Sequence, residues 1–184
     1  MTPKAQSVTL SGEPDGFLPP RAWRSEVFGD GHTRLVVSVP AEELQSVHLG
    51  LLGLVEGPWG VRYVQLTNRL TGQLPAPEGR VAMGVAPAKA LAVLKERPTL
   101  VWADGRHQLW VLGALKETVI LDEMGVIYLS PDDPMFRDAL TAFGIPESNA
   151  PTMDSRDYVK VAFHAEADAE EASLWESLKM LRWK

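Results

Sequence analysis

The sequence contains no cysteine among its 184 residues. This absence excludes disulfide bonds, thiolate zinc sites and cysteine nucleophiles together. The N-terminal 20 residues carry neither the apolar core of a signal peptide nor a membrane anchor. The most apolar stretch, residues 47–55, is far shorter than the ~20 residues that a membrane-spanning helix needs. We therefore expect a cytoplasmic protein with no membrane partner.

Clustered basic residues are also missing. The 18 Lys and Arg residues are scattered along the chain, and 24 Asp and Glu residues give a net charge of −6. A nucleic-acid surface needs grouped Lys and Arg to displace counterions from phosphates. The sequence therefore predicts no nucleic-acid partner.

Established catalytic and nucleotide-binding motifs are absent too, from the phosphate-binding loop to the nucleophile elbow and the zinc-protease helix. His164, Glu166 and Asp168 alternate as metal ligands on a strand would, but Asp168 is better explained as a helix cap. The sequence thus predicts no catalytic residue, no metal and no cofactor. An enzyme stays open as an alternative, because residues of one site need not be adjacent in sequence.

What the chain does contain is a globular composition, with 45% hydrophobic and 23% charged residues. Its length suits one domain with a substantial core. Residues 1–20 are rich in Pro, Gly and Ser, which predicts a flexible segment or an edge strand. Residues 21–184 are predicted to form a single α+β domain.

Hydrophobic periodicity predicts a mainly antiparallel sheet of about seven or eight strands, with four helices packed mostly on one face. The strands are expected at 22–28, 33–39, 59–66, 81–85 and 157–163, and within a central meander of four strands at 99–130. The helices are expected at 41–55, 88–96 and 135–143, and from a capping box at Asp168 and Glu171 to about Trp183. Loops are expected at 67–80 and 147–156.

The meander at 99–130 carries the most specific hint about function. If Asp104 and Gly105 form a hairpin turn, Trp102 lies opposite His107 on one face. The other face then carries Val101, Arg106, Gln108, Trp110 and Leu112. Apolar residues therefore occupy both faces, whereas a sheet with helices on one side usually has one polar face. Something must cover the second face.

Two explanations are open for the second face. We favour burial under the protein's own loops or N-terminal segment over contact with a partner or ligand on the Trp110 face. Trp and Arg are enriched at interface hot spots, so they lead the candidate binding residues. These candidates are Trp59, Arg62, Trp102, Arg106, His107 and Trp110.

The leading functional hypothesis is a non-enzymatic binding or accessory protein that acts through protein–protein contacts, with a homodimer as one form of such contact. The alternative is a small-molecule-binding protein or enzyme whose pocket lies between the sheet and the 67–80 or 147–156 loop. A weaker alternative is an immunity-type protein that neutralises a basic toxin, which only the acidity and size of the chain suggest.

Overall fold

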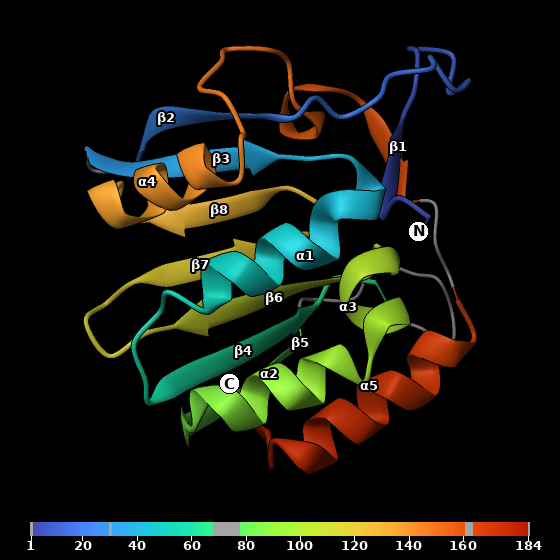
Figure 1. Cartoon of the computed structure of the whole chain (residues 1–184). Helices are drawn as coiled ribbons and strands as arrows, with labels where there is room; N and C mark the ends of the chain where they lie inside the picture. The colour runs from blue at the N-terminus through green and yellow to red at the C-terminus, as the bar shows by residue number, and fades with distance from the viewer. Residues whose placement is uncertain (1, 30, 68–77, 161–163, 184) are drawn as a thin grey trace.

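A large antiparallel sheet dominates the computed structural model, which describes residues 2–29, 31–67, 78–160 and 164–183 (Figure 1). Its strand order is β10-β5-β4-β6-β7-β8-β3-β2, and every neighbouring pair is antiparallel. The strands are β2 (Ala22–Phe28), β3 (His32–Ser38), β4 (Trp59–Gln65), β5 (Glu78–Val85), β6 (His107–Leu112), β7 (Thr118–Leu121), β8 (Ile127–Ser130) and β10 (Leu181–Trp183). The predicted α+β class with a mainly antiparallel sheet is confirmed.

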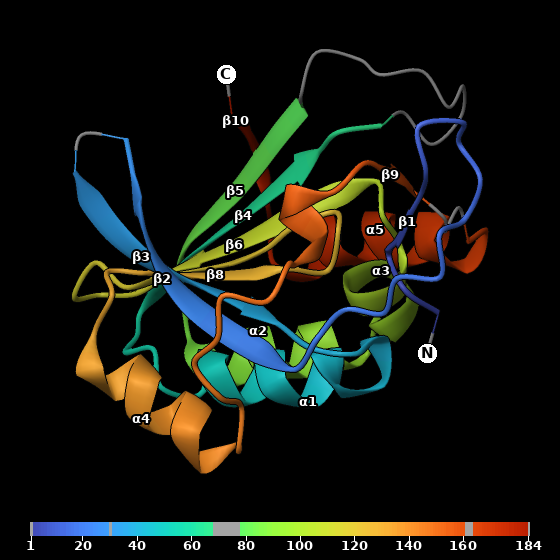
Figure 2. The ribbon, with the colours of Figure 1, turned by 90° about the horizontal axis from the view of Figure 1, so that it is seen from above.

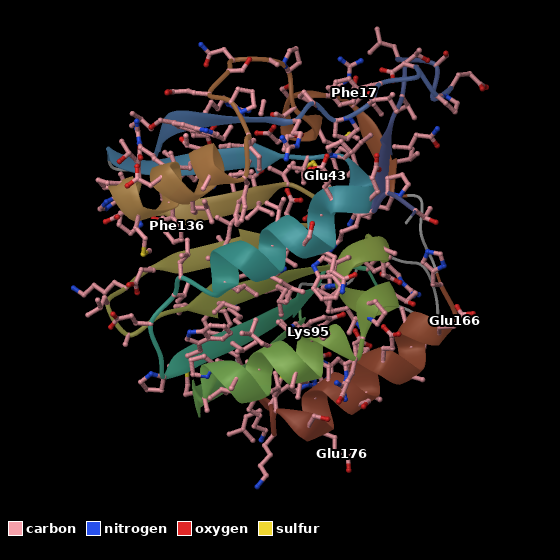
Figure 3. All side chains as sticks on the ribbon, in the orientation of Figure 1. Phe17, Glu43, Lys95, Phe136, Glu166 and Glu176 are labelled. Carbon is pink, nitrogen blue, oxygen red and sulfur yellow. The ribbon has the colours of Figure 1, made fainter. Side chains whose placement is uncertain are left out.

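The helices pack on one face of this sheet, and most of them lie below the strands in Figure 2. They are α1 (Ala41–Leu52), α2 (Pro87–Lys95), α3 (Pro98–Ala103), α4 (Pro134–Ala142) and α5 (Glu166–Ser177). Three of them have proline in the first turn. The backbone N–H groups there have no partner within the helix, so the missing N–H of proline costs no hydrogen bond. The main core lies between these helices and the sheet. Phe136, a residue of α4, is fully buried in this core (Figure 3).

The predicted four-strand meander is wrong in its first strand, because residues 98–103 form α3. The apolar run Leu100–Ala103 is buried throughout, and buried helices and buried strands cannot be told apart by such a run. Asp104 and Gly105 are therefore not a hairpin turn. A glycine is needed at position 105 because the backbone of Lys4 lies close to it. An added Cβ would overlap the Lys4 carbonyl. The meander itself holds from β6 to β8.

The predicted C-terminal helix is wrong at both ends. α5 begins at Glu166 with no side-chain cap, so Asp168 and Glu171 do not form the expected capping box. The helix ends at Ser177, and Lys179 adopts a left-handed backbone conformation with φ of 53°. This conformation turns the chain back, and β10 then pairs with β5 along the sheet edge. Two other expectations, for 68–77 of the 67–80 loop and for 161–163 of the last strand, lie outside the described residues.

The second face of the sheet is covered over one half. β1 (Ala5–Ser7) and β9 (Tyr158–Lys160) form a separate two-stranded sheet, and a 3-10 turn at Met153–Ser155 precedes β9. Met153 is buried against β3 and β8, and Phe17 packs against the same small cluster (Figure 3). Burial under the protein's own segments, the favoured explanation, thus holds for this half. Among the described residues, no helix is both long and apolar enough to cross a membrane.

Candidate functional site

The half of the second face that no described segment covers, formed by β10, β5, β4, β6 and β7, is the candidate site, and we call it the open face. Its side chains alternate along each strand with residues of the main core. They include Arg62, Val64, Val81, Gln108, Trp110, Leu112, Ile120, Leu181 and Trp183. Three of these large side chains are exposed: Leu112, Leu181 and Trp183. The open face therefore presents apolar and aromatic area to its surroundings.

Arg62 lies at the centre of the open face, on the middle one of the five strands. Its guanidinium carbon lies 4.8 Å from the ring centroid of Trp110 and 3.6 Å from that of Trp183. Antiparallel pairing places Trp110 directly beside Arg62, while Trp183 reaches it across Gly79, whose missing side chain leaves room for the indole. Cation–π attraction therefore holds the guanidinium between two indole rings.

No described carboxylate pairs with Arg62. Its Nε is buried without a hydrogen-bond partner, and burial lowers the pKa of the guanidinium from its usual value. Arg80, on the opposite face of the sheet, also lies over an indole, that of Trp175, and its Nε likewise has no partner, but its Nη2 pairs with Glu78 at 3.6 Å. Among the described residues, Arg62 thus has aromatic contacts but no anionic partner, which a guanidinium normally binds through its fork of N–H donors.

Trp110 is fixed in place by a chain of hydrogen bonds along the open face. Its Nε1 donates to Oε1 of Gln108 at 3.1 Å, and Nε2 of Gln108 donates to Oε2 of Glu123 at 2.8 Å. The Tyr158 hydroxyl donates to the other oxygen of Glu123 at 3.3 Å. The indole is therefore oriented before any ligand arrives, which reduces the entropy lost on binding.

Of the six predicted binding residues, the structure brings two together on the open face, Arg62 and Trp110. Trp59 is instead a core residue whose Nε1 donates to the Val55 carbonyl at 3.1 Å. Trp102 lies on α3 and not on the sheet, and its Nε1 donates to Nδ1 of His48 at 3.1 Å inside the core. The expectation that Trp102 shares a strand face with His107 is therefore wrong.

The remaining two predicted residues, Arg106 and His107, belong to a buried polar cluster at the opposite end of β4 and β6. Nε and Nη2 of Arg106 donate to the Asp104 carboxylate, and Nη2 also lies 3.2 Å from Asp168 on α5. The His107 ring stacks on Tyr63 with centroids 4.7 Å apart. This cluster faces the helices, so it is separate from the open face.

α5 supplies the other half of the polar cluster. Glu171 accepts a hydrogen bond of 2.5 Å from the Tyr63 hydroxyl and one of 3.1 Å from Nε2 of Gln65. These buried bonds join α5 to β4, and the Arg106–Asp168 pair joins it to the residue that precedes β6. We interpret the cluster as the polar attachment of α5 to the sheet, because its groups are hydrogen-bonded or paired with one another.

The sequence prediction missed Trp183, Tyr63 and Glu171. Trp183 was assigned to a helix, and only the strand pairing of β10 brings it to Arg62. The sequence pattern predicts Glu171 as part of a helix cap. Nothing in the sequence indicates that Glu171 accepts a hydrogen bond from Tyr63. Among the described residues, no three His, Asp or Glu side chains are grouped closely enough to hold a metal ion.

Comparison with known families, curated proteins and solved structures gave no match to this chain. A function for this chain is therefore inferred from the geometry of the open face.

Proposed function

We propose that this is a non-enzymatic binding protein and that the open face docks an acidic segment of a partner protein. The observation that carries the proposal is Arg62, a guanidinium clamped between Trp110 and Trp183 with no described carboxylate beside it. A partner's Asp or Glu would supply the missing anion in a charge-assisted hydrogen bond. The exposed Leu112 and Leu181 would contribute apolar contact around it.

The shape of the surface favours a macromolecule. The strands of the open face present a broad surface, and the hollow at its end, between Gly60, Met83 and Leu112, is open to the surroundings. A surface with preoriented Trp and Arg side chains at its centre and apolar residues around them resembles the hot-spot organisation of protein–protein interfaces.

Charge favours an acidic partner over the two other partners considered. A second copy of the chain packed symmetrically over the centre of the open face would bring two Arg62 guanidiniums together, and like charges repel in an interface. A basic toxin would meet the same repulsion at Arg62. The homodimer and the immunity-type protein are therefore less favoured than a partner that presents carboxylates.

A peptide titration tests the proposal. The probe is a short peptide of alternating Glu and Leu, and the same peptide with Gln in place of Glu is its uncharged control. Binding is followed by calorimetry for the wild type and for Arg62→Met. We expect saturable binding of the Glu peptide that is weakened about tenfold or more in Arg62→Met, because a charged hydrogen bond is worth about 1.5–3 kcal/mol.

Arg182→Met is the matched control. Arg182 also lies in the sheet and carries the same charge, but it pairs with Glu78 at 2.8 Å beside Arg80, away from Arg62. The Arg182→Met substitution lowers the positive charge of the protein by the same amount as Arg62→Met. It should leave the affinity for the Glu peptide nearly unchanged. The proposal would be contradicted by an equal loss of affinity in Arg62→Met and Arg182→Met, or by a Gln peptide that binds as tightly as the Glu peptide. Absence of binding by either peptide would also contradict it. Light scattering of the free protein tests the homodimer in the same samples.

A further inference from the structure

A second feature of the open face lies toward the covered half, where the side chains of β6, β7, β8 and β3 surround a depression of about 210 Å³. Trp110 and Tyr128 form aromatic walls, Ile120 and Met124 add apolar area, and Asp122 supplies a carboxylate. Tyr128 also packs with Met153 of the 147–156 loop, but no residue of that loop lines the depression.

Asp122 is the unusual member of this depression. It is 2% exposed, and its Oδ1 accepts hydrogen bonds of 2.8 Å from the backbone N–H groups of Met124 and Val126. Its Oδ2 is buried and has no hydrogen-bond partner among the described residues. The Tyr128 hydroxyl feels the charge of this carboxylate but makes no hydrogen bond of ordinary geometry to Oδ2. A buried oxygen without a partner costs stability, so a function is a reason to keep it.

The Arg34, Gln108 and Trp110 side chains of the depression already have partners. Nε of Arg34 donates to Glu26 at 2.7 Å, and the Arg34 guanidinium lies over the Tyr128 ring at 4.1 Å. The Gln108 amide bonds to Trp110 and Glu123, as described above. Among the described residues, Oδ2 of Asp122 and the neighbouring Tyr128 hydroxyl are therefore the polar groups of the depression that are left for a ligand, and Oδ2 can accept a hydrogen bond but not donate one when ionised.

We infer that this depression binds a small organic cation, an amine or amidinium group carried on a single aromatic ring. The cation would donate to Oδ2 of Asp122, and the ring would lie among Trp110, Ile120 and Met124. The volume supports one ring, because it is below the roughly 300–1,000 Å³ of pockets for larger ligands. Trp110 would contact both this ligand and the neighbouring Arg62.

The protonation of Asp122 gives the binding a pH dependence. Burial, followed by the negative charge of Glu123, raises the pKa of Asp122 to about 7. The charged and titratable groups around it are Lys4, Arg34, Glu123, Tyr128, Asp154 and Tyr158. Of these, Lys4 opposes the rise in the Asp122 pKa. A cationic ligand binds the ionised carboxylate, so its affinity should increase as the pH rises through about 7.

The test uses benzylamine as the probe and benzyl alcohol as its uncharged control, with binding followed by calorimetry and tryptophan fluorescence. We expect benzylamine to bind about tenfold or more tightly at about pH 8 than at about pH 5.5, where Asp122 is mostly protonated. Benzyl alcohol should bind weakly and without this pH dependence.

Two variants keep the test decisive. Asp122→Asn retains an oxygen for the two backbone N–H groups but loses the charge, and it should weaken benzylamine binding about tenfold or more. Ile120→Lys places an ammonium group in the depression from a partly exposed strand position and should also abolish binding, whether or not the first variant folds. Absence of benzylamine binding, equal binding of benzyl alcohol, or binding unchanged in both folded variants would overturn the inference.

Discussion

The guanidinium of Arg62 lies against the ring of Trp183, 3.6 Å from its centroid, and this contact joins the edge strand β10 to the centre of the sheet. The two residues are 121 positions apart in the sequence. With Trp110 on the other side, the arrangement produces a preformed, positively charged aromatic surface on a chain whose net charge is negative. The predictions below test the surface and the fold that supports it.

The tryptophans of the core and of the open face should differ in their effect on stability. Trp102→Ala removes a fully buried side chain and should lower the free energy of unfolding by about 3–5 kcal/mol. Trp110→Ala, at a partly exposed position, should cost about 1–2 kcal/mol. Denaturant unfolding of the two variants measures both values. A Trp110→Ala cost equal to that of Trp102→Ala would indicate that Trp110 serves the core and not a binding surface.

His48 should remain neutral in the folded protein. Burial, with a smaller effect of the Lys4 charge, lowers the pKa of His48 to about 3. Because the unfolded imidazole takes up a proton near its ordinary pKa of about 6.5 and the folded one does not, this residue makes the free energy of unfolding fall as the pH is lowered below about 6.5. NMR should show an unprotonated Nδ1 that accepts from Trp102 down to about pH 5. A folded-state titration near pH 6.5 would contradict this.

Asp122 should give the opposite pH dependence. Its folded pKa of about 7 lies above the ordinary value of 3.8, so its stabilising contribution is present below about pH 3.8 and is lost as the pH rises to about 7. Compared with Asp122→Asn, the wild type should therefore lose stability between about pH 4 and pH 7. Thermal unfolding of both proteins over this range measures the difference. A constant difference would mean that the carboxylate titrates normally.

Gly105→Ala should destabilise the protein, although an alanine normally restricts the unfolded chain more than a glycine. The new Cβ would overlap the Lys4 carbonyl, so the N-terminal segment would have to move away from the turn before β6. We expect a loss of about 1–3 kcal/mol in the free energy of unfolding, as for other overpacked sites. A neutral or stabilising effect would show that the segment before β1 yields without cost.

The sequence pattern predicts most of the regular strands and the helices that begin at Pro87 and Pro134. The alternation in β6 to β8 and the Pro87 and Pro134 positions are local signals, and the structure follows them. Residues 98–103 were mistaken for a strand because a fully buried helix has the same continuous apolar sequence. Periodicity alone cannot separate the two.

The candidate site was only partly predictable for a different reason. Arg62 and Trp110 could be nominated by residue type, but their contact depends on the register between β4 and β6. Trp183 depends on a left-handed Lys179, a conformation that sequence rarely signals in residues other than glycine. The unpartnered Oδ2 of Asp122 depends on packing from several elements, so no pattern within the chain could reveal it.

The central claim is that the open face binds acidic segments through Arg62, and the most direct measurement is an NMR titration of the six tryptophan indole N–H signals with the Glu–Leu peptide. The account predicts that the signals of Trp110 and Trp183 shift and saturate together, while those of Trp59 and Trp102, which are hydrogen-bonded in the core, stay in place. The Arg62→Met variant should abolish these shifts. Shifts that avoid Trp110 and Trp183, or that persist unchanged without Arg62, would contradict it.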